Sequence, residues 1–100
     1  MSRNKPINWI RSSLKDLCDD EIFPEAARRA AGYQLRKVQR GDDPDDWKPF
    51  EDAGAGTKEI RIKQTDGAFR VMYVAKFEDA IYVLHCMLIR LVPIGRFCFH

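Results

Sequence analysis

TKEIRIKQTDGAFRVMY, residues 57–73, decides the predicted fold, because it reads as a two-stranded β-hairpin. Two short runs rich in Ile, Val, Phe and Tyr flank Asp66-Gly67, a dipeptide that suits the positive φ angles of a tight hairpin turn. With these two residues as the loop, the expected cross-strand pairs are Thr65 with Ala68, Lys63 with Arg70, Arg61 with Met72 and Ile60 with Tyr73. The rest of the predicted fold is arranged around this hairpin.

The two faces of this hairpin differ in character, because side chains alternate between the faces along a strand. One face is expected to carry Glu59, Arg61, Lys63, Arg70 and Met72. The other is apolar and is expected to carry Ile60, Ile62, Phe69, Val71 and Tyr73. An antiparallel sheet can pack one face on a core and leave the other open, so we expect the cationic face to meet water or a polyanion.

Length and composition fit one globular domain over residues 1–100. The apolar fraction is 45% and the charged fraction 32%, which is ordinary for a folded chain and argues against disorder. The net charge is only +2, but acidic residues cluster in 16–25 and 42–52, whereas 28–40 and 58–76 are mostly basic. This asymmetry allows a basic patch, and so a polyanion partner, on a nearly neutral molecule.

Signals for export, membrane insertion or metal binding are missing from the sequence. The N-terminal segment lacks the apolar core of a secretory signal, and the longest apolar run, 80–92, is interrupted by His85 and Arg90 and too short to cross a bilayer. The three cysteines have no CxxC spacing and favour neither a disulfide framework nor a zinc site. We therefore expect a cytoplasmic protein with reduced thiols, no membrane contact and no cofactor.

The N-terminal half predicts one strand and two helices. A short strand is expected over Lys5 to Ile10, followed by a helix that begins at Ser12 or Ser13 and ends near Asp20. A second helix should begin at Pro24 and stop at Gly41. Its inward stripe is expected to consist of Ala27, Ala31, Leu35 and Val38.

The remaining segments predict an irregular region and a third strand. An acidic turn over 42–46 leads to an aromatic segment at 47–50, which is expected to plug one edge of the core without regular structure. Ala80 to about Val92 is almost wholly apolar and is expected to form a central strand buried on both faces. On this interpretation His85 is a hydrogen-bonded core histidine. The predicted class is α+β, with helices on one face of a mainly antiparallel sheet.

Several spaced blocks of the sequence resemble a known family. PINWI, SSLKDL, AARRAAGYQLRKVQRG, DDWKPF, GAGTKEIRI, GAFRVMYVAKF and IYVLHC occur in the order found in the phage-derived relatives of the HigB/RelE toxins, over about Lys5 to Cys86. The resemblance implies a RelE-like fold and the toxin component of a type II toxin-antitoxin system. It further implies an endoribonuclease (mRNA interferase) that works on the ribosome without a metal, and inhibition by a helix-turn-helix antitoxin.

The C-terminal segment, 87–100, departs from that family. Relatives continue into a lysine-rich run and a C-terminal helix, whereas this chain is hydrophobic and ends at His100. We expect the altered end to weaken catalysis, and the alternative function is an inactive relative that still binds an antitoxin. An uncovered apolar strand tends to pair with another chain, so a homodimer through this segment is also expected.

The family match points to a catalytic site on the hairpin. Arg61 and Arg70 stand at the family's arginine positions, and a guanidinium fork suits the charge that develops on a phosphate during RNA cleavage. Tyr73 matches a family tyrosine and is a candidate proton donor, although the hairpin pattern places it on the apolar face and favours a structural role. Lys58, Lys63 and Lys76 are the candidate RNA-binding residues.

Overall fold

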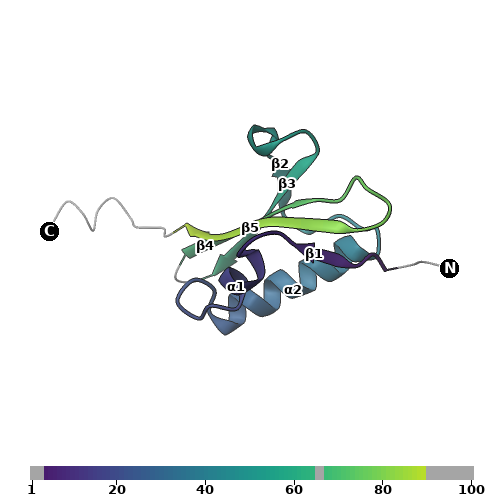
Figure 1. Ribbon diagram of the computed structural model, residues 1–100. Coiled ribbons are helices and arrows are strands. Elements are labelled where there is room, and N and C mark those ends of the chain that lie inside the picture. Colours follow the sequence, from purple (N-terminus) through teal and green to yellow (C-terminus); the bar gives the residue numbers. More distant parts are fainter. Residues whose placement is uncertain (1–3, 65–66, 90–100) are drawn as a thin grey trace, which may run out of the picture.

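The computed structural model describes residues 4–64 and 67–89 (Figure 1). Over these residues the elements in chain order are β1 (Ile7–Trp9), α1 (Ser13–Leu17), α2 (Glu25–Gln39), β2 (Trp47–Pro49), a 3₁₀ turn η1 (Glu51–Ala53), β3 (Thr57–Gln64), β4 (Gly67–Val74) and β5 (Ile81–Ile89). The predicted α+β class is confirmed, and the arrangement is compatible with a RelE-like fold.

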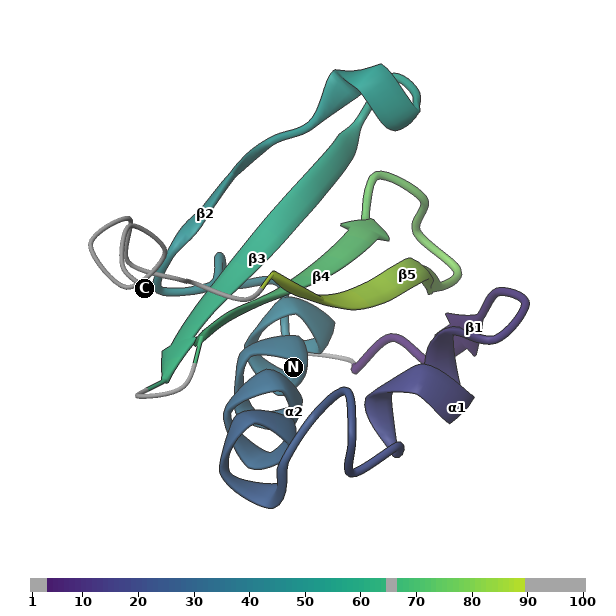
Figure 2. The same ribbon diagram turned by 90° about the vertical axis from the view of Figure 1, so that its left-hand side faces the viewer.

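The strands form one mixed sheet in the order β1-β5-β4-β3-β2. β1 runs parallel to β5, and the other neighbouring strands are antiparallel. Both helices lie on the same side of this sheet (Figures 1 and 2), with α2 beneath the β3–β4 hairpin. The sheet is therefore mainly antiparallel and carries its helices on one face, as the sequence predicts.

The register of the β3–β4 hairpin differs from the predicted one. Arg61 lies opposite Arg70, not Met72, and Gln64 lies opposite Gly67. Gly67 belongs to β4, so the predicted Asp66-Gly67 loop is wrong; the connection is residues 65–66, which lie outside the described residues. Because each position of β3 faces a partner two residues earlier in β4 than expected, the side chains keep their predicted faces.

The apolar face of the hairpin forms the core with the helices. All five residues predicted for it are at most 5% exposed, and they pack with the four predicted stripe residues of α2, which are at most 4% exposed. Phe23, which precedes α2, contacts Phe69 with ring centroids 5.0 Å apart. This packing fixes which side of β3 and β4 is left for other contacts.

The boundaries of α2 follow local sequence signals. Pro24 is the residue just before the helix, and Gly41 follows its C-terminal end with φ of +94°. The Gly41 N–H donates to the Val38 carbonyl and the Asp42 N–H to the Lys37 carbonyl, which is the Schellman arrangement that a left-handed glycine permits. The predicted helix from Pro24 to Gly41 is thus confirmed to within a residue or two at each end.

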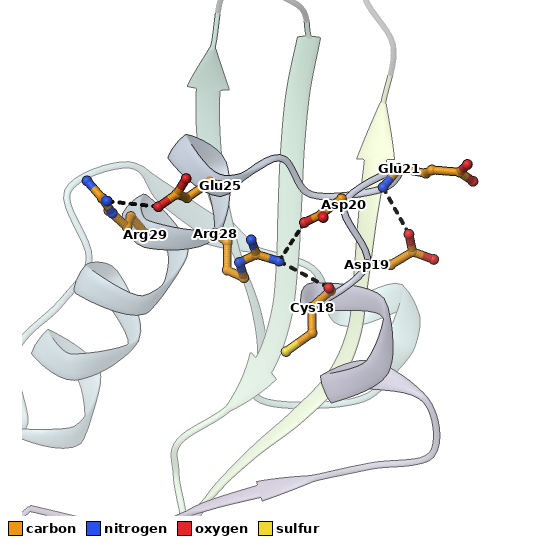
Figure 3. Close-up of polar contacts among 7 residues, drawn as sticks. All are labelled: Cys18, Asp19, Asp20, Glu21, Glu25, Arg28 and Arg29. Atoms are coloured by element: carbon orange, nitrogen blue, oxygen red, sulfur yellow. Dashed lines mark hydrogen bonds and ion pairs between the residues drawn. The ribbon is translucent and has the colours of Figure 1, made fainter.

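Arg28 of α2 ties the two helices together. Its Nη1 atom donates to the Cys18 carbonyl at 3.0 Å and contacts the Asp20 carboxylate at 3.1 Å (Figure 3). In the same loop, the Asp19 side chain accepts a hydrogen bond from the Glu21 backbone N–H at 2.9 Å. These contacts end α1 at Leu17, earlier than the predicted Asp20, because the following residues form the turn into α2.

The aromatic segment after the acidic turn is a strand and not the irregular plug that the sequence predicts. Residues Trp47–Pro49 form β2 and pair antiparallel with β3, with Lys48 opposite Glu59. A strand of three residues has too little periodicity to be recognised without its partner. The pairing extends the sheet beyond the hairpin and adds Lys48 to its open face.

The third predicted strand is β5, and a bulge changes its pattern. Val83 lies opposite Tyr73 and His85 opposite Met72, so Leu84 is an extra residue with no partner in β4. The prediction of a strand buried on both faces is wrong, because only one face is fully buried and His85 is exposed. Its predicted end near Val92 lies outside the described residues.

Candidate functional site

The face of the sheet opposite the helices carries the charged side chains in rows. Arg61 and Arg70 are directly opposite each other on β3 and β4, with side chains 34% and 27% exposed. Directly opposite residues on antiparallel strands have Cβ atoms about 5 Å apart. Both guanidinium groups therefore stand on one open face, close enough to contact a single phosphate.

A buried carboxylate lies beside these arginines, which the sequence analysis did not expect. Glu59 is fully buried, and its Oε2 atom lies 3.0 Å from Arg70 Nε and 3.4 Å from Arg61 Nε. Its oxygens accept no well-directed hydrogen bond from the described residues, so these contacts are ionic. Both arginines approach Glu59 through Nε, and their Nη atoms are the ones left to bind a phosphate.

A small pocket of about 220 Å³ opens beside the arginine pair. Arg61, Arg70 and the exposed Lys63 supply its cationic groups, and Ala68 and Ile89 contribute apolar surface. Lys63 thus lies with the arginines, as its predicted position on the same strand face requires. A concave site with three cations suits a phosphate group with part of its sugar.

The structure places the other predicted site residues elsewhere. Lys58 is on the helix side of β3, with Nζ 4.5 Å from the Trp47 ring centroid and 4.0 Å from Asp43. Lys76 follows β4; its Nζ donates to the Ala55 carbonyl at 3.3 Å and lies 5.4 Å from the Phe77 ring centroid. Neither lysine shares the arginine pocket.

Tyr73 lies in the core, on the side of the sheet away from the arginines. It is 1% exposed, and burial raises the pKa of its phenol well above the usual value of 10.0. In this arrangement its hydroxyl does not face a phosphate held by Arg61 and Arg70. Its placement agrees with the structural role that the hairpin pattern favours.

Two residues that the sequence analysis did not select also stand on the open face. Lys48 of β2 is exposed and lies opposite Glu59, and His85 of β5 is exposed and lies opposite Met72. Glu59 and Met72 are themselves paired, so these four residues form one row across the sheet. Lys48 could be placed only by recognising β2, and His85 only by recognising the bulge at Leu84.

An apolar pocket of about 420 Å³ lies on the same face beyond His85. It is lined by Ile10, Val74, Phe77, Asp79, Tyr82 and Leu84. Phe77 and Tyr82 meet edge to face, with ring centroids 5.6 Å apart and an interplanar angle of 89°. Aromatic rings in an accessible pocket are a type of surface on which a nucleobase can stack.

The described residues contain no group of three or more His, Cys, Asp or Glu side chains arranged to hold a metal ion.

Cys86 is buried, and burial raises the pKa of its thiol to about 12, so it remains protonated near neutral pH. Cys18 is exposed and free. Among the described helices, none is both long enough and apolar enough to span a bilayer.

Comparison with known proteins gives one family. The model of the family described as phage-derived protein Gp49-like (DUF891) matches residues 21–88, which run from the turn before α2 to one residue before the end of β5. No curated protein and no solved structure matches the chain. The matched segment is more than half of the chain and includes Arg61, Arg70 and His85.

Proposed function

The chain belongs to the phage-derived Gp49-like family, and from this premise we propose that it is a toxin of a type II toxin-antitoxin pair that cleaves RNA. The observation that carries the proposal is the placement of Arg61 and Arg70 opposite each other on the open face, beside a cationic pocket of about 220 Å³. The proposed substrate is mRNA, taken on the ribosome. The proposed inhibitor is a helix-turn-helix antitoxin.

The arginine pair suits the most demanding step of RNA cleavage. Attack of a ribose 2′-hydroxyl on the adjacent phosphorus produces a pentacovalent species with extra negative charge on its oxygens. Two guanidinium groups that stay charged and donate parallel hydrogen bonds can stabilise this charge without a metal. The Glu59 carboxylate contacts both guanidinium groups at Nε, and these contacts orient the groups before the substrate binds.

RNA cleavage by the purified full chain tests this proposal. We expect a single-stranded RNA to give products with a 2′,3′-cyclic phosphate and a 5′-hydroxyl, and cleavage to persist in EDTA. Arg61→Lys and Arg70→Lys keep the charge beside Glu59 but lose the fork, and each should lower kcat by about 10²–10³-fold. Arg36→Lys, on an exposed position of α2, is the matched control.

Two results would contradict the nuclease proposal. One is an intact chain that is correctly folded but leaves RNA uncleaved, both free and on translating ribosomes. The other is cleavage that survives both arginine substitutions unchanged. Induced expression gives the cellular counterpart, since growth arrest by the wild type should be relieved by Arg61→Lys or Arg70→Lys at equal protein level.

A catalytically inactive, antitoxin-binding relative is the second candidate. The buried Glu59 carboxylate neutralises part of the charge of the arginine pair. In addition, β1 pairs with β5 only as far as Val83, which leaves the following edge without a strand partner among the described residues. Such an edge can accept a strand from another protein. Binding of an adjacent helix-turn-helix gene product without growth arrest or RNA cleavage would favour this candidate.

A further inference from the structure

We propose that His85 is the general acid of this site and protonates the leaving 5′-oxygen; the inference rests on the RNA-cleaving function proposed above. The residue stands on an exposed part of β5, on the same sheet face as Arg61 and Arg70. It reaches that face through the bulge at Leu84.

The bulge determines which way His85 points. Ile81 and Val83 face the core, and strict alternation would send residue 85 there as well. The extra residue, Leu84, changes the phase, so His85 is exposed and Cys86 takes the core position at 2% exposure. Bulges often occur beside active sites, where they redirect a side chain. Here the chain orients an ionisable group outward in an otherwise apolar strand.

The position of His85 suits a leaving group held by the arginine pair. Arg70 lies opposite Met87 and His85 lies opposite Met72, so His85 and Arg70 are diagonal neighbours on adjacent strands. Diagonal neighbours have Cβ atoms about 7–8 Å apart, a gap that imidazole and guanidinium groups can bridge through one phosphate. The aromatic pocket with Phe77 and Tyr82 lies beyond His85, away from the cationic pocket.

An RNA strand that crosses this face would contact three kinds of side chain in order. The scissile phosphate lies at Arg61 and Arg70, the leaving oxygen at His85, and the next nucleobase in the aromatic pocket. Imidazole exchanges protons near neutral pH, which suits general acid catalysis. The other ionisable groups on the described face are Lys48, Glu59 and Lys63, together with Asp79 and Tyr82 at the aromatic pocket; of these, Glu59 is buried against the arginines.

The proposed step is a transesterification. The 2′-oxygen forms a bond to phosphorus and releases its proton to water, while the bond between phosphorus and the 5′-oxygen breaks. His85, protonated on its imidazole, transfers that proton to the departing 5′-oxygen and later regains one from solvent. The products are a 2′,3′-cyclic phosphate and a 5′-hydroxyl, and no oxidant, reductant or further reactant is consumed.

A sulfur-substituted RNA separates proton donation from a structural role. In a substrate whose bridging 5′-oxygen is replaced by sulfur, the leaving thiolate needs no proton. We expect His85→Gln in the full chain to cleave ordinary RNA about 10²–10⁴-fold more slowly than wild type. On the sulfur-substituted RNA, the same variant should cleave at nearly the wild-type rate. Arg36→Gln, an exposed change on α2, is the control for both substrates.

The outcomes distinguish this inference from the function on which it rests. Full activity of His85→Gln on ordinary RNA, or an equal loss on both substrates, overturns the general acid assignment while the nuclease proposal stands. A wild-type chain that cleaves neither RNA rejects the proposed function, and the role of His85 with it. Thermal unfolding of His85→Gln near the wild-type temperature confirms that the variant is folded, as expected for an exposed side chain.

Discussion

Glu59 places a negative charge inside the sheet, and among the described residues Arg61 and Arg70 are the cations paired with it. The carboxylate is fully buried, its oxygens accept no well-directed hydrogen bond from the described residues, and Arg70 Nε is 3.0 Å away. Removing one partner of a buried pair leaves a charge that neither water nor protein satisfies. The same residues should therefore affect stability as well as catalysis.

We predict that Arg70→Ala lowers the free energy of unfolding by about 2 kcal/mol, since Arg61 remains 3.4 Å from Glu59 and limits the loss. In a Glu59→Gln background the same substitution should cost less, because no buried charge is left behind. Urea denaturation of the four proteins in this double-mutant cycle measures the difference. Equal costs in both backgrounds would show that the ion pair does not contribute.

Individual site residues could be predicted only where strand alternation is regular. Arg61, Lys63 and Arg70 were placed on one face correctly because alternation survives a register error of two residues. The apolar run predicts a core position for His85, because a bulge is set by the pairing of two strands and leaves no local sign in the sequence. The contact of Glu59 with two arginines depends on side-chain packing that alternation alone does not describe.

At the scale of elements, α2 was predictable because its signals are local. Pro24, the buried stripe and Gly41 all act within the helix or next to it. β2 could not be predicted, because three residues become a strand only through pairing with β3. The predicted hairpin loop is wrong by one position for a related reason. The register depends on pairing along both strands, whereas Asp66-Gly67 indicates only a local preference for a turn.

The acidic loop after α2 is anchored to the helix by Asp45. Its carboxylate binds Lys37 and accepts a hydrogen bond from Gln34 Nε2 at 2.9 Å, while the Asp45 N–H donates to Gln34 Oε1 at 2.8 Å. The hydrogen bond with Lys37, followed by that with Gln34, lowers the pKa of Asp45 below its usual 3.8. A carboxyl group with a lowered folded-state pKa stabilises the fold above its unfolded pKa and loses this effect on acidification.

We predict that Asp45→Asn lowers the unfolding temperature at neutral pH, because the charge-assisted contact with Lys37 is lost. The difference from wild type should shrink as pH falls below 3.8 and through the lowered pKa, where the wild-type carboxyl is itself protonated. Thermal unfolding followed by circular dichroism at several pH values measures this. Asp46→Asn, at the next exposed position, is the control. A difference in unfolding temperature between Asp45→Asn and wild type that does not change with pH would contradict the prediction.

At the scale of the whole molecule, the edge of β5 beyond Val83 is the feature that bears on self-association. β1 covers β5 only from Ile81 to Val83, so the edge from Leu84 to Ile89 has no strand partner among the described residues. Unpaired edges with apolar side chains tend to pair with another chain. The sequence predicts a homodimer through an apolar C-terminal strand, of which residues 90–100 lie outside the described part, and we propose that pairing begins at this edge.

Light scattering of the purified chain tests that proposal. We expect a mass of two chains or more for wild type and a shift toward one chain for Leu84→Lys, because a charge on an edge strand opposes pairing. Tyr33→Lys, at an exposed position of α2 away from both edges of the sheet, is the control and should leave the mass unchanged. A wild-type protein that is monomeric at high concentration would reject the proposal.

The separation of core and open face determines how different mutations would inactivate the protein. In β3 the odd positions, and in β4 the even ones, point away from the helices, while their neighbours hold the hydrophobic interior. Under the proposed function, cells that survive induced expression of the toxin should carry inactivating mutations of two kinds. The two kinds differ in whether the mutated strand position points to the open face or to the core. Changes that keep the charge, such as Arg61→Lys or Arg70→Lys, would leave abundant but inactive protein, whereas changes at Ile60 or Val71 would destabilise the core and expose the chain to proteases. The exceptions are Thr57, Glu59, Met72 and Val74, which are buried although they point to the open side.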